Sequence, residues 1–276
     1  MNNRCNICLD DCNRKNICDC SKCDKIGKCP KLLIPTIRIT NKCTQECPHC
    51  CFSSSPKSNI IMSVDTSKSI SKFIKSNNIL SSNVMGGEFF CNPNWYDILS
   101  EIISNLTVMR LVSNGDWINS EEVKRKFREF ISENKDKLII SISNDKWHNN
   151  KNVDKVDKFL KDIGVKYNVA DYSEQTDKTI VPIGRSEYKY SFYSSLGCYC
   201  HNPEKKYSFL IDENGEIYKC SFGMIKYANI NEYLEGGFDK RFREFNKRFY
   251  SIFIPNCASC VRSVKSNKKF KYVRND

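Results

Sequence analysis

Residues 33–50 read LIPTIRITNKCTQECPHC, and this stretch decides both the fold and the chemistry of the chain. Its first part, Leu33–Thr40, is rich in β-branched residues, which predicts a strand. Cys43, Cys47 and Cys50 follow directly, with C-x3-C-x2-C spacing. Three soft thiolates on a short loop can converge on one metal centre. Iron–sulfur clusters usually take four cysteine ligands, so three leave one iron open, whereas zinc more often uses four ligands in two C-x2-C pairs.

The sequence after this loop alternates between helix-like and strand-like segments. Such alternation predicts an α/β fold with a parallel sheet. About 150 residues are too few for the eight units of a complete barrel, so we expect a partial (β/α)6 TIM-like barrel over residues 31–190. The further strands are expected at residues 83–85, 108–112, 138–143, 165–170 and 179–183, and the helices at residues 63–76, 95–106, 121–134 and 153–163.

Unusual residues fall where the expected strands end. Gly86-Gly87-Glu88 follows the second strand, Asn114-Gly115 follows the third, and Ser141 and Ser143 lie at the fourth. In parallel α/β folds the chemistry is carried out at the carboxyl ends of the strands. The sequence therefore predicts one site at this edge, shared with the cysteine loop.

The composition is that of an ordinary globular protein except for its cysteines. Of 276 residues, 40% are hydrophobic and 28% are charged, and no apolar stretch approaches the roughly 18 residues of a membrane span. The polar, cysteine-rich N-terminus does not resemble a signal peptide, so we expect a cytoplasmic protein without a membrane partner. An odd number of cysteines, 17, in such a chain indicates thiolates that bind metal rather than disulfides.

The cysteine loop resembles the signature of the radical SAM superfamily, including its place after the first strand. The resemblance implies that Cys43, Cys47 and Cys50 bind a [4Fe-4S] cluster, whose fourth iron is chelated by the amino and carboxylate groups of S-adenosylmethionine (SAM). His49 departs from the family, in which the residue before the last cysteine is commonly aromatic.

Further segments resemble parts of the family's cofactor site. Gly86-Gly87-Glu88 resembles its GGE segment, which implies that the backbone and Glu88 receive the methionine amino group of SAM. Ser141 resembles a polar residue that contacts the ribose or methionine. Ile183 and Gly184 belong to a stretch that resembles the one beside the adenine. Lys151-Asn152 stands where relatives often carry an arginine for the SAM carboxylate, so the carboxylate contact is unassigned.

The last cysteines suggest a second metal site in a small α+β domain, residues 191–264. Leu210–Cys220 predicts a hairpin with a turn at Asn214-Gly215, and an aromatic-rich helix is expected at residues 238–249. The order of the cysteines resembles the twitch domain, a shortened relative of SPASM domains, which implies an auxiliary [4Fe-4S] cluster. Zinc is the alternative metal, and Cys198 is the alternative to Cys200 as a ligand. The expected ligands are Cys200, Cys220, Cys257 and Cys260.

Two terminal segments flank these domains. Residues 1–30 form a cysteine-rich extension in which Cys5-x2-Cys8 and Cys20-x2-Cys23 are consistent with a structural zinc or a further iron–sulfur cluster, without a definite ligand set. Residues 265–276 form a basic tail, and the formal net charge of the chain is +12. We interpret this charge as a solvated basic face; a zinc-stabilised nucleic-acid-binding module is the alternative.

The resemblance implies a radical SAM oxidoreductase. Such an enzyme cleaves SAM reductively to a 5′-deoxyadenosyl radical, which abstracts hydrogen from a substrate. We favour a ribosomally made peptide as the substrate, to be oxidised, cross-linked or epimerised, with a small-molecule dehydrogenase as the alternative. The electron comes from a one-electron reductant such as flavodoxin or ferredoxin. For an epimerisation, a spare thiol would return the hydrogen atom; the candidates are Cys51, Cys91, Cys198 and Cys200.

Overall fold

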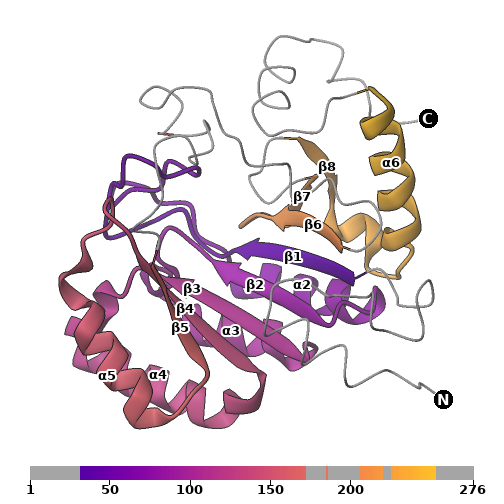
Figure 1. Cartoon of the computed structure of the whole chain (residues 1–276). Helices are drawn as coiled ribbons and strands as arrows, with labels where there is room; N and C mark the ends of the chain where they lie inside the picture. The colour runs from indigo at the N-terminus through magenta and orange to yellow at the C-terminus, as the bar shows by residue number, and fades with distance from the viewer. Residues whose placement is uncertain (1–31, 172–184, 186–205, 220–224, 253–276) are drawn as a thin grey trace, which may run out of the picture. The chain divides into compact units, whose positions relative to one another are not determined.

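A computed structural model describes residues 32–171, 185, 206–219 and 225–252 (Figure 1). The N-terminal extension, the expected strand 179–183 and the basic tail lie outside the described residues. Several expected ligands and contacts lie outside them too, namely Ile183, Gly184, Cys198, Cys200, Cys220, Cys257 and Cys260.

The described strands form one sheet in the order β5-β4-β3-β2-β1-β6-β7-β8. β1 to β5 are parallel neighbours, β6 pairs with the other edge of β1 in parallel, and β7 and β8 add antiparallel strands. The strands are β1 (Leu32–Arg38), β2 (Ser81–Met85), β3 (Val108–Ser113), β4 (Leu138–Asn144), β5 (Tyr167–Asp171), β6 (Lys206–Ile211), β7 (Glu216–Tyr218) and β8 (Lys226–Asn229). The expected mixed α/β fold with a parallel sheet is confirmed.

Helices connect the parallel strands and begin at polar caps. The Ser63 and Ser120 side chains accept hydrogen bonds from backbone N–H groups in the first turns of α2 and α4, which otherwise would lack partners. The α-helices are α2 (Val64–Ser76), α3 (Trp95–Ser104), α4 (Glu121–Asn134), α5 (Val153–Ile163) and α6 (Phe238–Ile252). Short 3₁₀ helices are η2 (Phe89–Cys91), η3 (Asp116–Asn119), η4 (Lys135–Lys137), η5 (Asn150–Asn152) and η9 (Ile230–Tyr233). None of the helices in the described part of the chain is long and apolar enough to cross a membrane.

One face of the sheet is apolar and belongs to the core. Ile37, Val84, Leu111 and Ile140 are paired in register across β1 to β4, and each is at most 1% exposed. Because side chains alternate along a strand, the neighbouring residues point to the opposite face. That face carries more polar side chains, and its carboxyl edge is where the site forms.

The C-terminal strands continue the sheet of the barrel instead of forming a sheet of their own. β6 pairs with β1 over six residue pairs, and the Phe209 ring packs against Phe238 and Phe242 of α6 at 4.9 and 5.2 Å. The predicted hairpin is confirmed for β6 and β7, with Gly215 at φ +76° in its turn. The boundary expected at residue 191 lies outside the described residues.

Candidate functional site

The cysteine loop runs from the end of β1 to α2 and is fixed at its base. Two isolated bridges close it, Thr40 with Ile61 and Lys42 with Ser55, and the Cys43 N–H donates to the Ser55 carbonyl at 3.1 Å. Cys43 and Cys47 are buried, while Cys50 is half-buried. The loop therefore presents three thiols on a backbone that is anchored beside the sheet.

Gly87 allows the end of β2 to lie directly against this loop. The Gly87 N–H donates to the Thr40 carbonyl at 2.8 Å, and the Glu88 N–H donates to the Lys42 carbonyl at 2.9 Å. A Cβ atom on Gly87 would lie 2.4 Å from the Lys42 carbonyl oxygen and 2.7 Å from the Cys43 Cβ. Only glycine fits here without moving the loop backbone.

Glu88 is a buried carboxylate with one unused oxygen. Glu88 is only 1% exposed. Its Oε2 accepts hydrogen bonds from Ser113 Oγ at 2.9 Å and from the Asn114 N–H at 2.8 Å. Oε1 is buried and meets no donor among the described residues. Burial raises the pKa of Glu88 to about 7, although the bonds from Asn114 and Ser113 and the nearby backbone N–H of Phe90 oppose the shift. A buried acceptor of this kind fits a cationic ammonium ligand.

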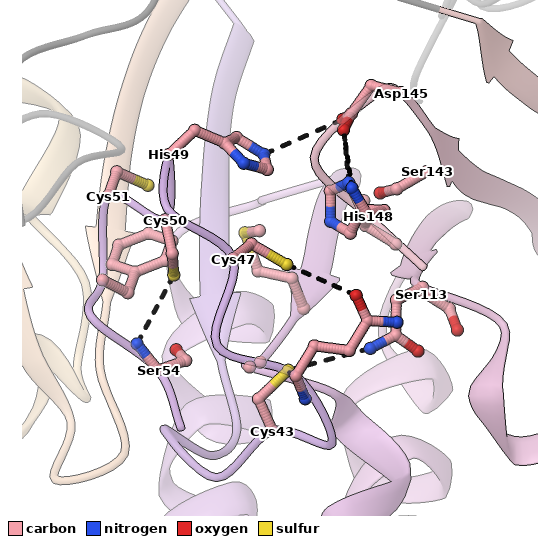
Figure 2. A pocket seen from close by; sticks show the side chains of 17 residues that line it. Cys43, Cys47, His49, Cys50, Cys51, Ser54, Ser113, Ser143, Asp145 and His148 are labelled. Atoms are coloured by element: carbon pink, nitrogen blue, oxygen red, sulfur yellow. Dashed lines mark hydrogen bonds and ion pairs between the residues drawn. The ribbon is translucent and has the colours of Figure 1, made fainter. Parts of the chain in front are cut away.

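The three thiols and this edge of the sheet enclose a cavity of about 260 Å³ (Figure 2). Cys43, Cys47 and Cys50 line it together with Gly86 and Gly87. The ends of β3 and β4 and the residues after them contribute another part of the wall, including Ser113, Asn114, Ser143, Asp145 and His148. The structure thus brings together the cysteine loop and the strand ends that the sequence predicted to share one site.

The number of thiols bears on which metal the loop could hold. Structural zinc usually takes four protein ligands, often in two C-x2-C pairs. Three thiolates leave one iron of a [4Fe-4S] cluster open to an outside ligand, so this loop suits such a cluster better than a closed zinc site.

The Cys43 sulfur is held as a buried thiol. Burial raises the pKa of Cys43 to about 12, and this exceeds the opposing effect of the Gln45 N–H, which donates to the sulfur at 3.4 Å. The Asn114 side-chain amide also donates to it, at 3.7 Å. Metal ligation requires the thiolate, so binding of a cluster here releases a proton and supplies the positive charge that burial demands.

Asp116, after β3, holds the first half of the cysteine loop. Its Oδ2 accepts from Thr44 Oγ1 at 2.7 Å and from Gln45 Nε2 at 2.9 Å, and its Oδ1 accepts from Asn152 Nδ2 at 3.2 Å. These bonds fix the residues between Cys43 and Cys47. Asn152, next to the exposed Lys151, is therefore a partner of the loop anchor.

His49, Asp145 and His148 form a polar cluster at the wall of the cavity (Figure 2). His148 Nδ1 lies 2.8 Å from Asp145 Oδ2, and His49 Nε2 lies 3.8 Å from the same oxygen. Burial opposes protonation of His148, but the Asp145 carboxylate and a hydrogen bond with Cys47 raise its pKa to about 10. Burial lowers the pKa of His49, whose ring packs 5.0 Å from that of Trp147.

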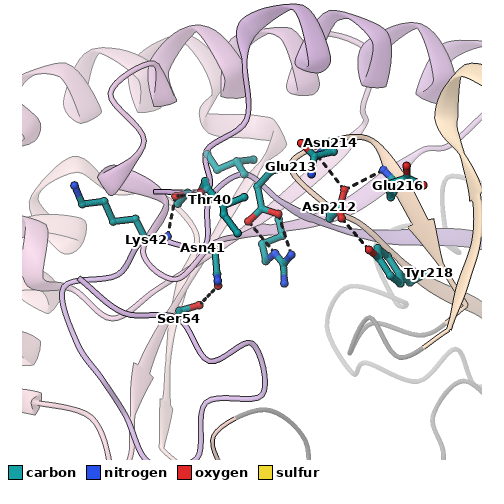
Figure 3. Close-up of polar contacts among 12 residues, drawn as sticks. Thr40, Asn41, Lys42, Ser54, Asp212, Glu213, Asn214, Glu216 and Tyr218 are labelled. Carbon is teal, nitrogen blue, oxygen red and sulfur yellow. Dashed lines mark hydrogen bonds and ion pairs between the residues drawn. The ribbon is translucent and has the colours of Figure 1, made fainter. Parts of the chain in front are cut away.

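A second cluster of polar side chains lies between the C-terminal hairpin and the cysteine loop (Figure 3). Arg38 donates two hydrogen bonds of 2.9 Å to the buried Glu213 carboxylate, and its guanidinium lies 4.9 Å from the Phe52 ring centre. Ser54 Oγ donates to Asn41 Oδ1 at 2.7 Å. Burial raises the pKa of Glu213, and the Arg38 bonds counteract this shift.

The remaining predicted site residues differ in whether they line the cavity. Ser141 lies on β4 and accepts a hydrogen bond of 3.2 Å from Asn168 Nδ2, whereas Ser143, two residues on, lines the cavity. Of the two spare thiols that are described, Cys51 lines the cavity and Cys91 does not. Burial raises the pKa of Cys91 to about 11.

Sequence reasoning missed Asp116, Asp145 and His148, although all three follow predicted strands. Their position after strand ends was an available signal. Sequence reasoning also did not predict that Arg185, next to Gly184, contacts the cysteine loop through three hydrogen bonds.

Sequence comparison finds two relatives in Bacillus subtilis (strain 168). The chain is 28% identical over 116 residues to the antilisterial bacteriocin subtilosin biosynthesis protein AlbA, and 32% identical over 116 residues to the putative peptide biosynthesis protein YydG. These matches cover 42% and 41% of this chain, but only 25% of AlbA and 36% of YydG. No protein-family model matches the chain.

Structure comparison finds the same fold in BtrN, which was solved in complex with AdoMet and 2-DOIA. The TM-score is 0.54 at 14% sequence identity, over 87% of this chain and 89% of BtrN. This likeness concerns the fold alone. The Cys43–Cys50 loop thus resembles the radical SAM signature in a chain that shares the fold of BtrN and is similar, over part of its length, to AlbA and YydG.

Proposed function

We propose that the chain binds a [4Fe-4S] cluster through Cys43, Cys47 and Cys50, cleaves SAM reductively and modifies a ribosomally made peptide. The observation that carries this proposal is the cavity itself. Three thiols share its wall with the ends of β2 to β4. Behind that wall, at the end of β2, Glu88 has a buried oxygen without a donor.

The bound cofactors would supply a 5′-deoxyadenosyl radical that abstracts hydrogen from the substrate. The chain's own residues would bind and orient. Glu88 Oε1 would accept from the methionine ammonium, which provides the positive charge that the buried carboxylate lacks. Asp116 would keep the first half of the loop fixed, and the walls of the cavity would exclude water from the site.

Ser141, Ile183 and Gly184 complete the proposed SAM site, with Ser141 near the ribose or methionine and the other two beside the adenine. The resemblance to the family supports these three roles. Ser143 and the cationic His148 line the cavity and are additional candidates for polar contacts with SAM.

The sequence relatives support a peptide substrate. Both are named for peptide or bacteriocin biosynthesis, although each match spans well under two thirds of the relative's length. The net charge of +12 would favour an acidic chain over a cationic one. A small-molecule substrate is the second candidate, because BtrN, which shares the fold, was solved with 2-DOIA.

An auxiliary [4Fe-4S] cluster held by Cys200, Cys220, Cys257 and Cys260 belongs to the same proposal, with the seven cysteines of residues 1–30 as a further iron–sulfur or zinc site. Counting metals in anaerobically reconstituted protein tests this. About eight irons per chain in the parent, with about four fewer in a Cys257/Cys260→Ala variant, support the auxiliary cluster, and about four in the parent contradict it. Zinc at the level of one ion per chain would assign the second site to zinc.

The substrate class is tested with reconstituted enzyme, SAM and a flavodoxin or ferredoxin reductant. Candidate acidic precursor peptides encoded near the gene are incubated in deuterated water and analysed by mass spectrometry. Loss of two hydrogen atoms indicates oxidation or cross-linking, and uptake of one deuteron indicates epimerisation. Cleavage of SAM that no peptide stimulates, but that a small alcohol or amine does, would contradict the peptide assignment.

A further inference from the structure

Arg185 lies far from the cysteine loop in sequence but contacts it at three points. Its backbone N–H donates to the Cys50 carbonyl at 3.0 Å. Its guanidinium donates from Nη1 to the Cys47 carbonyl at 2.6 Å and from Nη2 to the Ser54 carbonyl at 2.5 Å. All three acceptors are backbone oxygens of the segment that carries two of the three thiols.

This segment has little regular structure of its own. Turn bonds join the Cys50 N–H to the Cys47 carbonyl at 3.1 Å and the Ser53 N–H to the Cys50 carbonyl at 3.3 Å. Ser53 has φ +53°, a left-handed conformation that a non-glycine residue seldom adopts. Such a turn needs outside contacts to hold it, and charge-assisted bonds from a planar guanidinium are suited to fix two carbonyls at once.

Two opposite charges hold the two halves of the loop. Asp116 binds Thr44 and Gln45, between the first two cysteines. Arg185 binds Cys47, Cys50 and Ser54, which span the last two cysteines and the residues after them. The two contacts are made from different parts of the chain, one after β3 and one after β5.

We propose that Arg185 is a positioning residue. It fixes the Cys47–Ser54 segment, so that the loop retains the cluster, and its positive charge raises the reduction potential of the cluster. This inference rests on the proposed function. Arg185 donates to the backbone, not to the thiols, so it leaves the sulfurs available as ligands. A fixed positive charge beside a cluster stabilises its more negative, reduced form.

The test compares Arg185→Gln and Arg185→Lys with the parent. All retain the backbone N–H that binds Cys50, so only the guanidinium changes. Arg125→Gln is the matched control, because Arg125 is a 69% exposed arginine on α4 that lies 4.0 Å from Glu129. Each protein is reconstituted anaerobically without SAM. Cluster loss to excess chelator is followed by absorbance, and the reduction potential by a titration monitored with electron paramagnetic resonance.

Arg185→Gln is expected to lose its cluster about tenfold faster and to have a more negative potential, because two charge-assisted bonds and one charge are lost. Arg185→Lys keeps the charge but not the planar fork. We therefore expect it to retain the parental potential while losing the cluster at an intermediate rate. Arg125→Gln should match the parent in both measurements.

Parental rates and potentials in Arg185→Gln would overturn the inference. If that variant folds poorly by circular dichroism, Arg185→Lys decides, since a loss rate equal to that of the parent contradicts the positioning role. Failure of the parent to assemble any [4Fe-4S] cluster would instead refute the proposed function, so the two failures are distinguishable.

Discussion

Replacing Glu88 by glutamine should stabilise the ligand-free protein while weakening SAM binding. The carboxylate is fully buried, and burial raises its pKa from 4.5 to about 7. A shift of this size corresponds to about 3 kcal/mol between the protonation states. Glutamine has nearly the same shape and can still accept from Ser113 and Asn114, but it carries no charge.

The sign of the effect follows from proton binding. Between pH 4.5 and 7 the folded protein holds a proton on Glu88 that the unfolded chain has released. The free energy of unfolding therefore falls as the pH rises through this window, and the full loss is present above pH 7. Glu88→Gln lacks this loss, so it should be more stable than the parent by up to about 3 kcal/mol at pH 8, and nearly equal to it below pH 4.5.

The assay is urea unfolding of cluster-free protein at several pH values, with Glu133→Gln, an exposed glutamate on α4, as the control. SAM binding is then measured calorimetrically on reconstituted protein, where Glu88→Gln should bind at least tenfold more weakly because a charge-assisted bond to the ammonium is lost. A stability difference that does not change with pH would refute the assigned pKa. Unchanged SAM binding would refute the assigned ligand.

Three other substitutions test the anchoring of the loop. Gly87→Ala should destabilise the fold by roughly 2–4 kcal/mol in urea unfolding, because its Cβ would overlap the Lys42 carbonyl; equal stability would contradict the close approach. Asp116→Ala should lower the iron content after reconstitution and cost about 1–3 kcal/mol, since Thr44 and Gln45 lose their acceptor; normal iron loading would show that this anchor is dispensable. His148→Gln should destabilise cluster-free protein below about pH 6.5, where the raised pKa gives the parent its full advantage. The difference should shrink as the pH rises through 10, and a deficit that is constant with pH would rule out a protonated His148.

Local patterns predicted much of the fold. The helices at residues 121–134 and 153–163 have the predicted bounds, because their apolar periodicity and flanking residues are local signals. The hairpin at Asn214-Gly215 was equally readable. The parallel pairing of β6 with β1 was not predicted, since no local pattern specifies a partner about 175 residues away.

The candidate site was likewise predictable only in its local motifs. The cysteine spacing and Gly86-Gly87-Glu88 are contiguous motifs. The structure places the three cysteines, Gly86 and Gly87 at one cavity edge, while Glu88, next in the chain, is buried. The contacts that hold the loop come from Asp116, His148 and Arg185, whose roles depend on strand register and on which strand end lies beside which. Ser141 and Ser143 lie two residues apart on one face of β4. Which of them reaches the cavity depends on how far along the strand the cavity lies, and the alternation of side chains does not give this position.

The central claim is that Cys43, Cys47 and Cys50 hold a cluster that cleaves SAM, and one measurement tests it directly. Anaerobically reconstituted parent protein and a Cys43/Cys47/Cys50→Ala triple variant are reduced with dithionite in the presence of SAM, and 5′-deoxyadenosine is quantified. We expect the product from the parent only, together with about four fewer irons per chain in the variant. Zinc in place of iron and no 5′-deoxyadenosine from the parent would contradict the account.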